Sequence, residues 1–184
     1  DEIFDWCKEN LLPKSNVEWL CEPGVIYKLN QMLEQHGQFI ADGHHYYLPV
    51  ENTSLAKNYD CEVQWVEGDE IKQFENDDRF DEALLFTDDV ENVLAVCAVK
   101  GGQILGMAGC TNDGQNVWQI GVNVTEEGQG KGIGTCVTWL IKNRVLEMGT
   151  VPYYGTVESH IKSQKVAIQA GFMPVFYEMF SDEI

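Results

Sequence analysis

The sequence predicts an α/β protein of the α+β type: a mixed, mostly antiparallel sheet flanked by helices, with a small N-terminal α/β extension. Three strand patterns follow one another between Val93 and Val124, separated by tight turns. A glycine-rich loop then joins the third strand to an amphipathic helix, and a further strand, helix and strand complete the chain. The 184 residues suffice for one good core and a small extension.

Residues 1–57 are predicted to form the extension and residues 58–184 the main domain. A short helix should end before Pro13, and its apolar face holds Ile3, Phe4, Cys7 and Leu11. A second helix is expected from about Pro23 to Gln35, because proline suits a first turn and Gly37 follows the end. Three roles stay open for this extension: covering one side of a binding site in the main domain, forming a homodimer contact, or being the tail of a longer protein.

A β-hairpin is expected next, in which Asp42-Gly43 turns Gln38–Ala41 into His44–Val50. His44 and His45 are adjacent, so on a strand they point to opposite faces and cannot share a metal. We interpret both as ordinary strand residues and expect no metal site. The pattern lapses over Asn52–Tyr59, where we expect a linker.

The main domain begins with a strand at Cys61–Val66 and a helical pattern over Asp69–Phe86. That second segment is acidic, through Glu75, Asp77, Asp78, Asp81 and Glu82. A solvated helix face explains these charges. A surface that attracts a cationic substrate is the alternative.

The meander comprises Val93–Lys100, Ile104–Thr111 and Val117–Val124, turning at Gly101-Gly102 and at Asn112-Asp113-Gly114. The helix after the glycine loop should end at Gly149, a typical C′ residue. A strand at Val151–Val157, a helix over about Ser159–Ala170 and a strand at Phe172–Phe180 follow.

The glycine loop has four glycines in seven residues, Gly128, Gly130, Gly132 and Gly134. Glycines let the backbone approach a ligand and take positive φ, and the free amides of the following helix suit a phosphate or pyrophosphate. The spacing fits neither the P-loop nor the dinucleotide Gly-x-Gly-x-x-Gly pattern. An anion-binding turn is therefore predicted, and a purely structural turn is the alternative.

The loop satisfies Gln/Arg-x-x-Gly-x-Gly/Ala through Gln129, Gly132 and Gly134. This stretch resembles the acyl-CoA-binding signature of the GNAT superfamily of N-acetyltransferases. The order of elements from roughly Cys61 to Phe180 also resembles the GNAT core. Gly171-Phe172 is similar to the Gly-Phe that opens the family's final strand.

The resemblance implies that acetyl-CoA is the co-substrate and a small amine the acceptor, with direct attack on the thioester. The backbone of Val122, Asn123 and Val124 would pair with the pantetheine arm. Residues expected to hold the pyrophosphate are Gln129, Gly130, Lys131, Gly132, Ile133, Gly134 and Thr135. Ser163 stands where members carry a small residue close to the cofactor.

The chain departs from the family pattern at two catalytic positions. Ala167 stands where many members have the tyrosine that protonates the CoA thiolate. Gln119 stands where some members have a glutamate, and an amide cannot serve as a base at neutral pH. Other groups must therefore move the protons.

Glu158 is our first candidate for the base, acting through water, although it also suits an exposed pair with Lys162 at i+4. His160 is a second candidate, with a helix N-terminal contact as its alternative. Tyr154 and Tyr177 are candidate acids, and core or pocket lining is the alternative for both.

The formal charge of −18 disfavours nucleic acid and anionic membranes as partners, since both need a basic surface. No apolar run approaches a membrane span. The start, Asp1-Glu2-Ile3, is acidic, so no signal peptide is expected, and sequence upstream of residue 1 stays an open alternative. The six cysteines include no CxxC pair, which favours reduced thiols and a cytoplasmic protein.

Two alternatives to a small-molecule N-acetyltransferase stay open. A domain lacking the tyrosine and the strand glutamate could bind acyl-CoA as a non-catalytic sensor or interaction module. An enzyme that uses a longer acyl group or an amino-acid acceptor is the other. Turnover with any amine would distinguish an enzyme from the non-catalytic module. A preference for donors with a longer acyl chain would indicate the second alternative.

Overall fold

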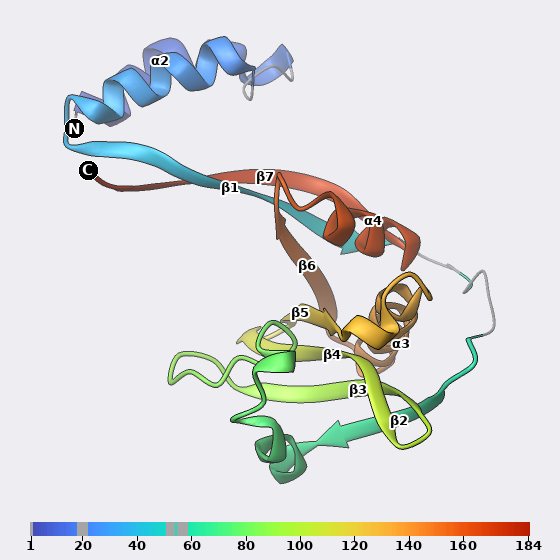
Figure 1. Cartoon of the computed structure of the whole chain (residues 1–184). Helices are drawn as coiled ribbons and strands as arrows, with labels where there is room; N and C mark the ends of the chain where they lie inside the picture. Colours follow the sequence, from blue (N-terminus) through green and yellow to red (C-terminus); the bar gives the residue numbers. More distant parts are fainter. Residues whose placement is uncertain (1, 18–21, 51–53, 55–58) are drawn as a thin grey trace. The chain divides into compact units, whose positions relative to one another are not determined.

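The computed structural model describes residues 2–17, 22–50, 54 and 59–184. Of the expected linker, only Ser54 and Tyr59 fall among them. The chain forms two compact units, Asp1–His44 with Glu178–Ile184, and His45–Tyr177 (Figure 1). The domain boundary expected between residues 57 and 58 stays a prediction.

The first unit contains α1 (Glu2–Asn10), the 3-10 helix η1 (Leu12–Val17) and α2 (Pro23–Glu34). Proline opens α2, as expected. The side-chain oxygen of Asn30 on α2 accepts the amide hydrogen of Ile40 at 2.7 Å, which ties the helix to the strand that follows.

The predicted hairpin is wrong. One continuous strand, β1 (Gln38–Pro49), runs through Asp42-Gly43. An Asp-Gly hairpin turn needs positive φ at both central residues, and Gly43 is not among the glycines with positive φ. The strand is kept extended because it pairs on both sides, with β6 and β7.

The sheet has seven strands in the order β2-β3-β4-β5-β6-β1-β7. Strands β2 to β5 pair antiparallel in sequence order, and β5 pairs parallel with β6. This confirms the predicted mixed, mostly antiparallel sheet. The remaining strands are β2 (Glu62–Glu67), β3 (Asn92–Lys100), β4 (Gln103–Gly114), β5 (Val117–Val124), β6 (Val151–Val157) and β7 (Phe172–Glu183).

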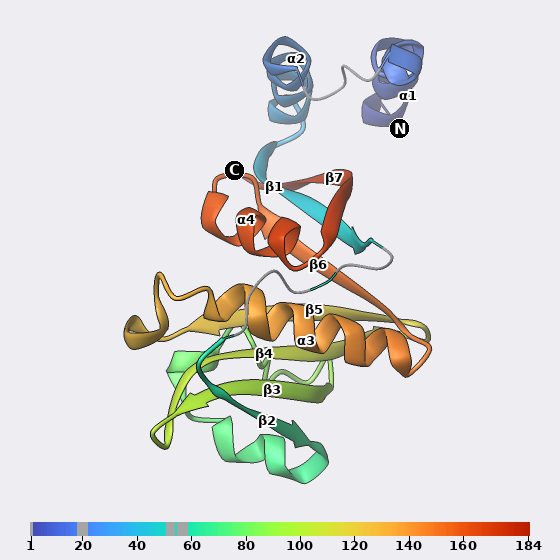
Figure 2. The same cartoon turned by 90° about the vertical axis from the view of Figure 1, so that its right-hand side faces the viewer.

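Helix α3 (Ile133–Glu147) runs along β4 and β5 (Figure 2). Ile133, Val137 and Ile141, whose spacing predicts this amphipathic helix, are buried against the sheet, and Val145 is buried beside them. The shorter α4 (Ile161–Gln169) contacts α3 and β6. No described helix has the length and apolar character needed to cross a membrane. The five described cysteines are free thiols.

The opposite face of β3 and β4 is covered by residues 68–84, and the helix expected over Asp69–Phe86 is wrong. Only two short 3-10 helices form, η2 (Gly68–Phe74) and η3 (Asp78–Phe80). The Asp77 carboxylate accepts hydrogen bonds from the Arg79 amide and guanidinium, a local bond that competes with helix formation. Phe80, Ala83 and Leu84 then bury themselves against the sheet.

Candidate functional site

Strands β5 and β6 separate part-way along their length. Their pairing starts at Val117↔Val151 and ends at Ile120↔Tyr154. Beyond this last pair, β6 diverges from β5 (Figure 2). Among the described pairs, none joins Gly121–Val124 of β5 to Gly155–Val157 of β6. We call this gap the β5–β6 opening. The backbone groups of Val122, Asn123 and Val124 on its edge are free on that side to pair with an extended ligand.

The glycine loop lies at the end of β5, directly after this opening. Gly130 and Gly132 have φ of 71° and 79°, values that glycine adopts without strain. In the described part of the chain, no acceptor is bound by five amides of the loop and first helical turn: those of Gly130, Gly132, Ile133, Gly134 and Thr135. With the dipole of α3 behind them, these amides make a cradle for a phosphate group.

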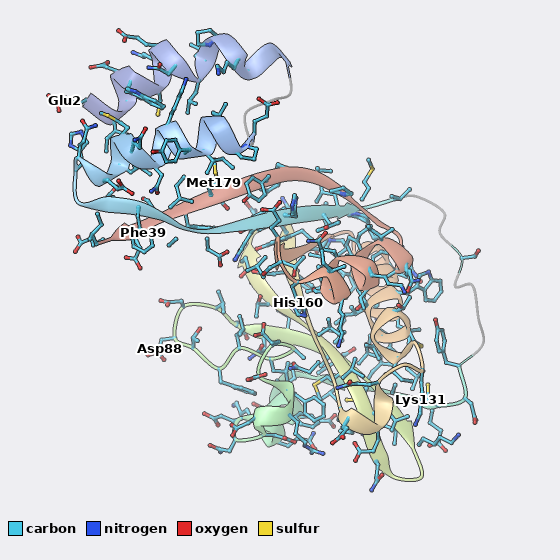
Figure 3. The ribbon with its side chains drawn as sticks, turned by 45° about the horizontal axis from the view of Figure 1, so that its top comes forward. Glu2, Phe39, Asp88, Lys131, His160 and Met179 are labelled. Carbon is cyan, nitrogen blue, oxygen red and sulfur yellow. The ribbon has the colours of Figure 1, made fainter. Side chains whose placement is uncertain are left out.

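Other side chains around the cradle vary in accessibility. Lys131 is exposed at the loop and His160 lies just before α4 (Figure 3). The Thr135 hydroxyl donates to Gln169 on α4 at 3.2 Å. A Cβ placed on Gly132 would lie 2.8 Å from Cε1 of Tyr59, so the Tyr59 ring rests on the loop. Sequence reasoning placed Tyr59 in a linker and missed this contact.

A free strand edge that leads into an amide cradle suits an extended ligand ending in phosphates. The family model described as Acetyltransferase (GNAT) family matches residues 59–172 of the chain. The chain belongs to the GNAT acetyltransferase family. The family model spans the opening, the cradle and α4, so the GNAT resemblance seen in the sequence is confirmed. No curated protein matches the chain.

Solved GNAT structures show the same fold at low identity. A GCN5-related N-acetyltransferase from Kribbella flavida is 18% identical with a TM-score of 0.62, over 86% of this chain and 63% of its own. An N-acetyltransferase-like protein from Streptococcus suis is 12% identical (TM-score 0.59), over 89% and 69%. A GNAT-family acetyltransferase from Colwellia psychrerythraea is 17% identical (TM-score 0.57), over 83% and 60%. This chain thus spans less than two thirds of the length of the Kribbella flavida and Colwellia psychrerythraea proteins.

The sheet face opposite α3 carries a polar cluster beside the opening. The Asp113 carboxylate accepts hydrogen bonds from the backbone N–H of Gln119 (3.0 Å), the Tyr153 hydroxyl (3.1 Å) and the Thr111 hydroxyl (3.2 Å). The Tyr153 hydroxyl is also 3.1 Å from Oε1 of Gln119. Burial raises the pKa of Tyr153, and the Asp113 charge raises it further, so this phenol keeps its proton.

Aromatic rings extend this cluster into what we call the acceptor face, which holds Gln119 and Gly121 of β5 and Tyr153 and Gly155 of β6. Tyr46 stacks on Phe176 with ring centroids 4.6 Å apart. A Cβ on Gly155 would lie 3.3 Å from the Tyr46 ring and 3.5 Å from Nε2 of Gln119. Gln119, which stands where some members of the family have a glutamate, is therefore a side-chain amide that accepts a hydrogen bond from Tyr153.

The predicted catalytic residues fall into two groups. The Tyr177 hydroxyl donates a hydrogen bond to the Glu158 carboxylate at 3.3 Å. Glu158 directly follows the end of β6, beyond the last β5–β6 pair at Ile120↔Tyr154. His160 is exposed at the N-terminal cap of α4 and makes no capping bond through its side chain. The roles assigned to all three stay predictions.

The second group is Tyr154 alone, which lies beside Ser163, a residue predicted to lie near the cofactor. The Tyr154 hydroxyl and the Ser163 hydroxyl are 2.8 Å apart, and Tyr154 is 2% exposed. Tyr154 belongs to the last β5–β6 pair and projects to the α3 and α4 side of the sheet. Burial raises its pKa to about 12, the Ser163 hydrogen bond lowers it, and the Glu82 charge raises it. A proton donor thus lies one helical turn from Ala167, where the family's tyrosine is missing.

Proposed function

We propose that the protein is an N-acetyltransferase that moves an acetyl group from acetyl-CoA to the primary amine of a small molecule by direct attack. The observation that carries the proposal is the continuity of the β5–β6 opening with the amide cradle. A pantetheine arm needs an unpaired strand edge, and a pyrophosphate needs free amides at a helix start. The chain offers both along β5 and the loop that follows.

The residues that would hold acetyl-CoA are those of the strand edge and the cradle. Val122, Asn123 and Val124 would pair through their backbone. The five cradle amides, those of Gly130, Gly132, Ile133, Gly134 and Thr135, would bind the pyrophosphate. Gln129 starts this loop, Lys131 adds a positive charge, and Ser163 lines the α4 side. Acetyl-CoA supplies the acyl group as an activated thioester.

This chain's own groups orient the acceptor and move protons. The acceptor face offers an amide, a phenol and aromatic rings beside the opening, all suited to a small amine. Tyr154 keeps its proton at neutral pH because burial raises its pKa to about 12, so it can protonate the departing sulfur from the α4 side.

Isothermal titration with acetyl-CoA and with CoA tests the cradle first. Micromolar binding of acetyl-CoA is expected, followed by CoA release when amines, polyamines and amino acids are screened. Failure to bind at millimolar ligand would contradict the proposal, because the loop would then be a structural turn.

A non-catalytic acyl-CoA sensor is the second candidate, and one observation favours it. Gln119 and Ala167 stand where other members have proton-transfer groups, and Ala167 is fully buried. Such a sensor would bind acetyl-CoA with no turnover of any amine. A catalyst would release CoA in proportion to the amine added.

A further inference from the structure

A segment far from the glycine loop lies against the start of the β5–β6 opening. Gly121 is the first residue of β5 beyond the last pair with β6. A Cβ on Gly121 would lie 1.7 Å from the backbone oxygen of Glu82 and 3.3 Å from Cα of Ala83. Only a glycine admits the backbone of Glu82 this close to the sheet. Glu82 therefore stands on the acceptor face at the point where the strands separate.

Asn123, two residues further along β5, fixes this segment. Its side-chain oxygen accepts the amide hydrogens of Glu82 at 3.0 Å and Ala83 at 2.6 Å. Its amide nitrogen donates to the Asp81 carboxylate at 3.0 Å. Phe80 and Ala83 on either side are 1% and 2% exposed, which anchors the segment in the core. Hydrogen bonds and packing thus fix the backbone of Glu82, although Glu82 as a whole is exposed.

The carboxylates nearby differ in what they bind. Asp77 binds Arg79, Asp81 binds Asn123, and Asp113 accepts three hydrogen bonds. Across the described residues, no hydrogen bond or ion pair engages the Glu82 carboxylate. Its charge nonetheless raises the pKa of Tyr154, whose hydroxyl lies on the other side of the sheet at the last β5–β6 pair. The carboxylate is therefore within electrostatic reach of the opening.

We propose that Glu82 is the catalytic base of this transferase: its carboxylate binds the acceptor's ammonium at the β5–β6 opening and removes the proton, and Asn123 positions it. The inference rests on the proposed acetyltransferase function and adds the residue that the family's strand glutamate would otherwise supply. A carboxylate with no donor of its own is the natural partner for an ammonium group, and aromatic neighbours favour the same cation.

The proton and electron balance is complete without a further reactant. The ammonium gives one proton to Glu82, and the amine nitrogen then bonds to the acetyl carbon as the carbon–sulfur bond breaks. The sulfur leaves with the electron pair and takes a proton from Tyr154, which recovers one from the acylated nitrogen through water. Glu82 releases its proton to solvent. The products are the N-acetyl amide, the free thiol and one proton.

The kinetic test compares Glu82→Gln with Glu62→Gln and Glu158→Gln, using acetyl-CoA and four amines: spermidine, tyramine, lysine and glucosamine. Glu62 on β2 is an exposed matched control. We expect Glu82→Gln to lower kcat about 100-fold or more while the Kd for acetyl-CoA is unchanged. The control Glu62→Gln should keep most of the activity, and a larger loss of kcat for Glu158→Gln than for Glu82→Gln would contradict the assignment. If Glu82→Gln keeps kcat within about threefold, the assignment is wrong.

A second readout needs no acceptor. Bromoacetyl-CoA carries an electrophilic carbon where the acetyl group would lie, and attack by a carboxylate oxygen expels bromide and leaves an ester. We expect peptide mass spectrometry to find this ester on Glu82, and excess acetyl-CoA to prevent it. An ester on Glu158 instead, or none on Glu82, would overturn the proposal. If acetyl-CoA does not bind at all, the proposed function itself fails, and the titration reports that separately.

The positioning role of Asn123 has its own double variant. Asn123→Asp keeps the acceptor for both backbone amides but sets a carboxylate against Asp81, so kcat should fall without loss of acetyl-CoA affinity. Adding Asp81→Asn restores a donor–acceptor pair with the roles exchanged, and kcat should recover. If the double variant is as slow as the single one at equal thermal stability, Asn123 does not position the base.

Discussion

Gly132→Asp separates an anion-binding loop from a structural turn. Gly132 has a φ of 79°, and among the L residues Asp and Asn are enriched in that region. The new Cβ would meet the tip of the Tyr59 ring at 2.8 Å, a flexible side chain that can move. Strain at positive φ costs about 1–2 kcal/mol, which should lower the melting temperature by about 2–8 °C without unfolding the protein.

The charge effect on binding is larger than this strain. Two like charges about 4 Å apart repel by about 4 kcal/mol at an effective dielectric constant of about 20. One carboxylate against one pyrophosphate charge would therefore weaken acetyl-CoA binding roughly 10³-fold. The strain itself is present in both the free and the bound protein, so it largely cancels from the affinity.

Gly132→Asn is the matched control, because it shares the shape and the backbone preference of Asp and lacks the charge. Isothermal titration of both variants with acetyl-CoA, alongside thermal melting, measures the difference. We expect Asn to cost about tenfold or less and Asp about 10³-fold. Equal affinities for the two variants would refute the assignment of the pyrophosphate to this cradle.

Three further predictions follow from the contacts around the opening. Tyr154→Phe should lower kcat and, by removing the bond to Ser163, cost about 1 kcal/mol of unfolding free energy. Burial raises the pKa of Tyr154 in the folded protein to about 12, so its contribution to folding stability is present below pH 10 and is lost as pH rises through 12. Alkaline denaturation of the variant should lack that loss of stability. The same loss in the variant and the parent protein would contradict the assignment. Gly121→Ala should lower the free energy of unfolding by about 1–3 kcal/mol and should also lower kcat, because the new methyl group pushes Glu82 off the sheet. Gly24→Ala is the control: no atom lies within 4 Å of the added Cβ, so thermal melts should show a neutral or slightly stabilising change. Lys131→Gln should weaken acetyl-CoA binding about three- to tenfold in low salt and less in high salt, since Lys131 is exposed; a salt-independent loss would mean that its charge is not the cause.

Local patterns predicted the part of the fold that positions the cofactor. The strand over Val151–Val157 is found with the expected bounds, and the expected helix ends within two residues of Gly149. Both signals are short-range: alternation in a strand, helical spacing, and a glycine at a helix end. The glycine loop was recognisable for the same reason, because its pattern is contained in six consecutive residues.

The errors arose where distant contacts override local preference. Asp42-Gly43 is a strong hairpin signal, yet pairing with β6 and β7 keeps β1 extended. The acidic stretch after Asp69 has helical spacing, yet Phe80, Ala83 and Leu84 pack against β3 and β4, and only short 3-10 helices form there. Neither outcome can be read from a window of a few residues.

The acceptor face was missed for a related reason. Asn123 binds residues 40 positions earlier in the chain, and Tyr153 binds Asp113 across the same separation. One signal in the sequence could have found the face. The strand Ile104–Thr111 is interrupted by glycine, and a glycine inside a strand often marks a close backbone approach.

Glycines mark the start of the β5–β6 opening on both strands. The last pair is Ile120↔Tyr154, and Gly121 and Gly155 are the next residues on their strands. Gly121 faces Gly109 across β4 and β5, and the backbone of residues 82–83 fills the space left by both missing side chains. Gly155 is covered by Tyr46 and Gln119 instead. A glycine weakens a strand, so two at the same level cost stability that the segment carrying Glu82 restores by packing there. The contact that stabilises the sheet is thus also the one that brings a carboxylate to the opening, and a variant that fills Gly121 should lose fold stability and catalysis together.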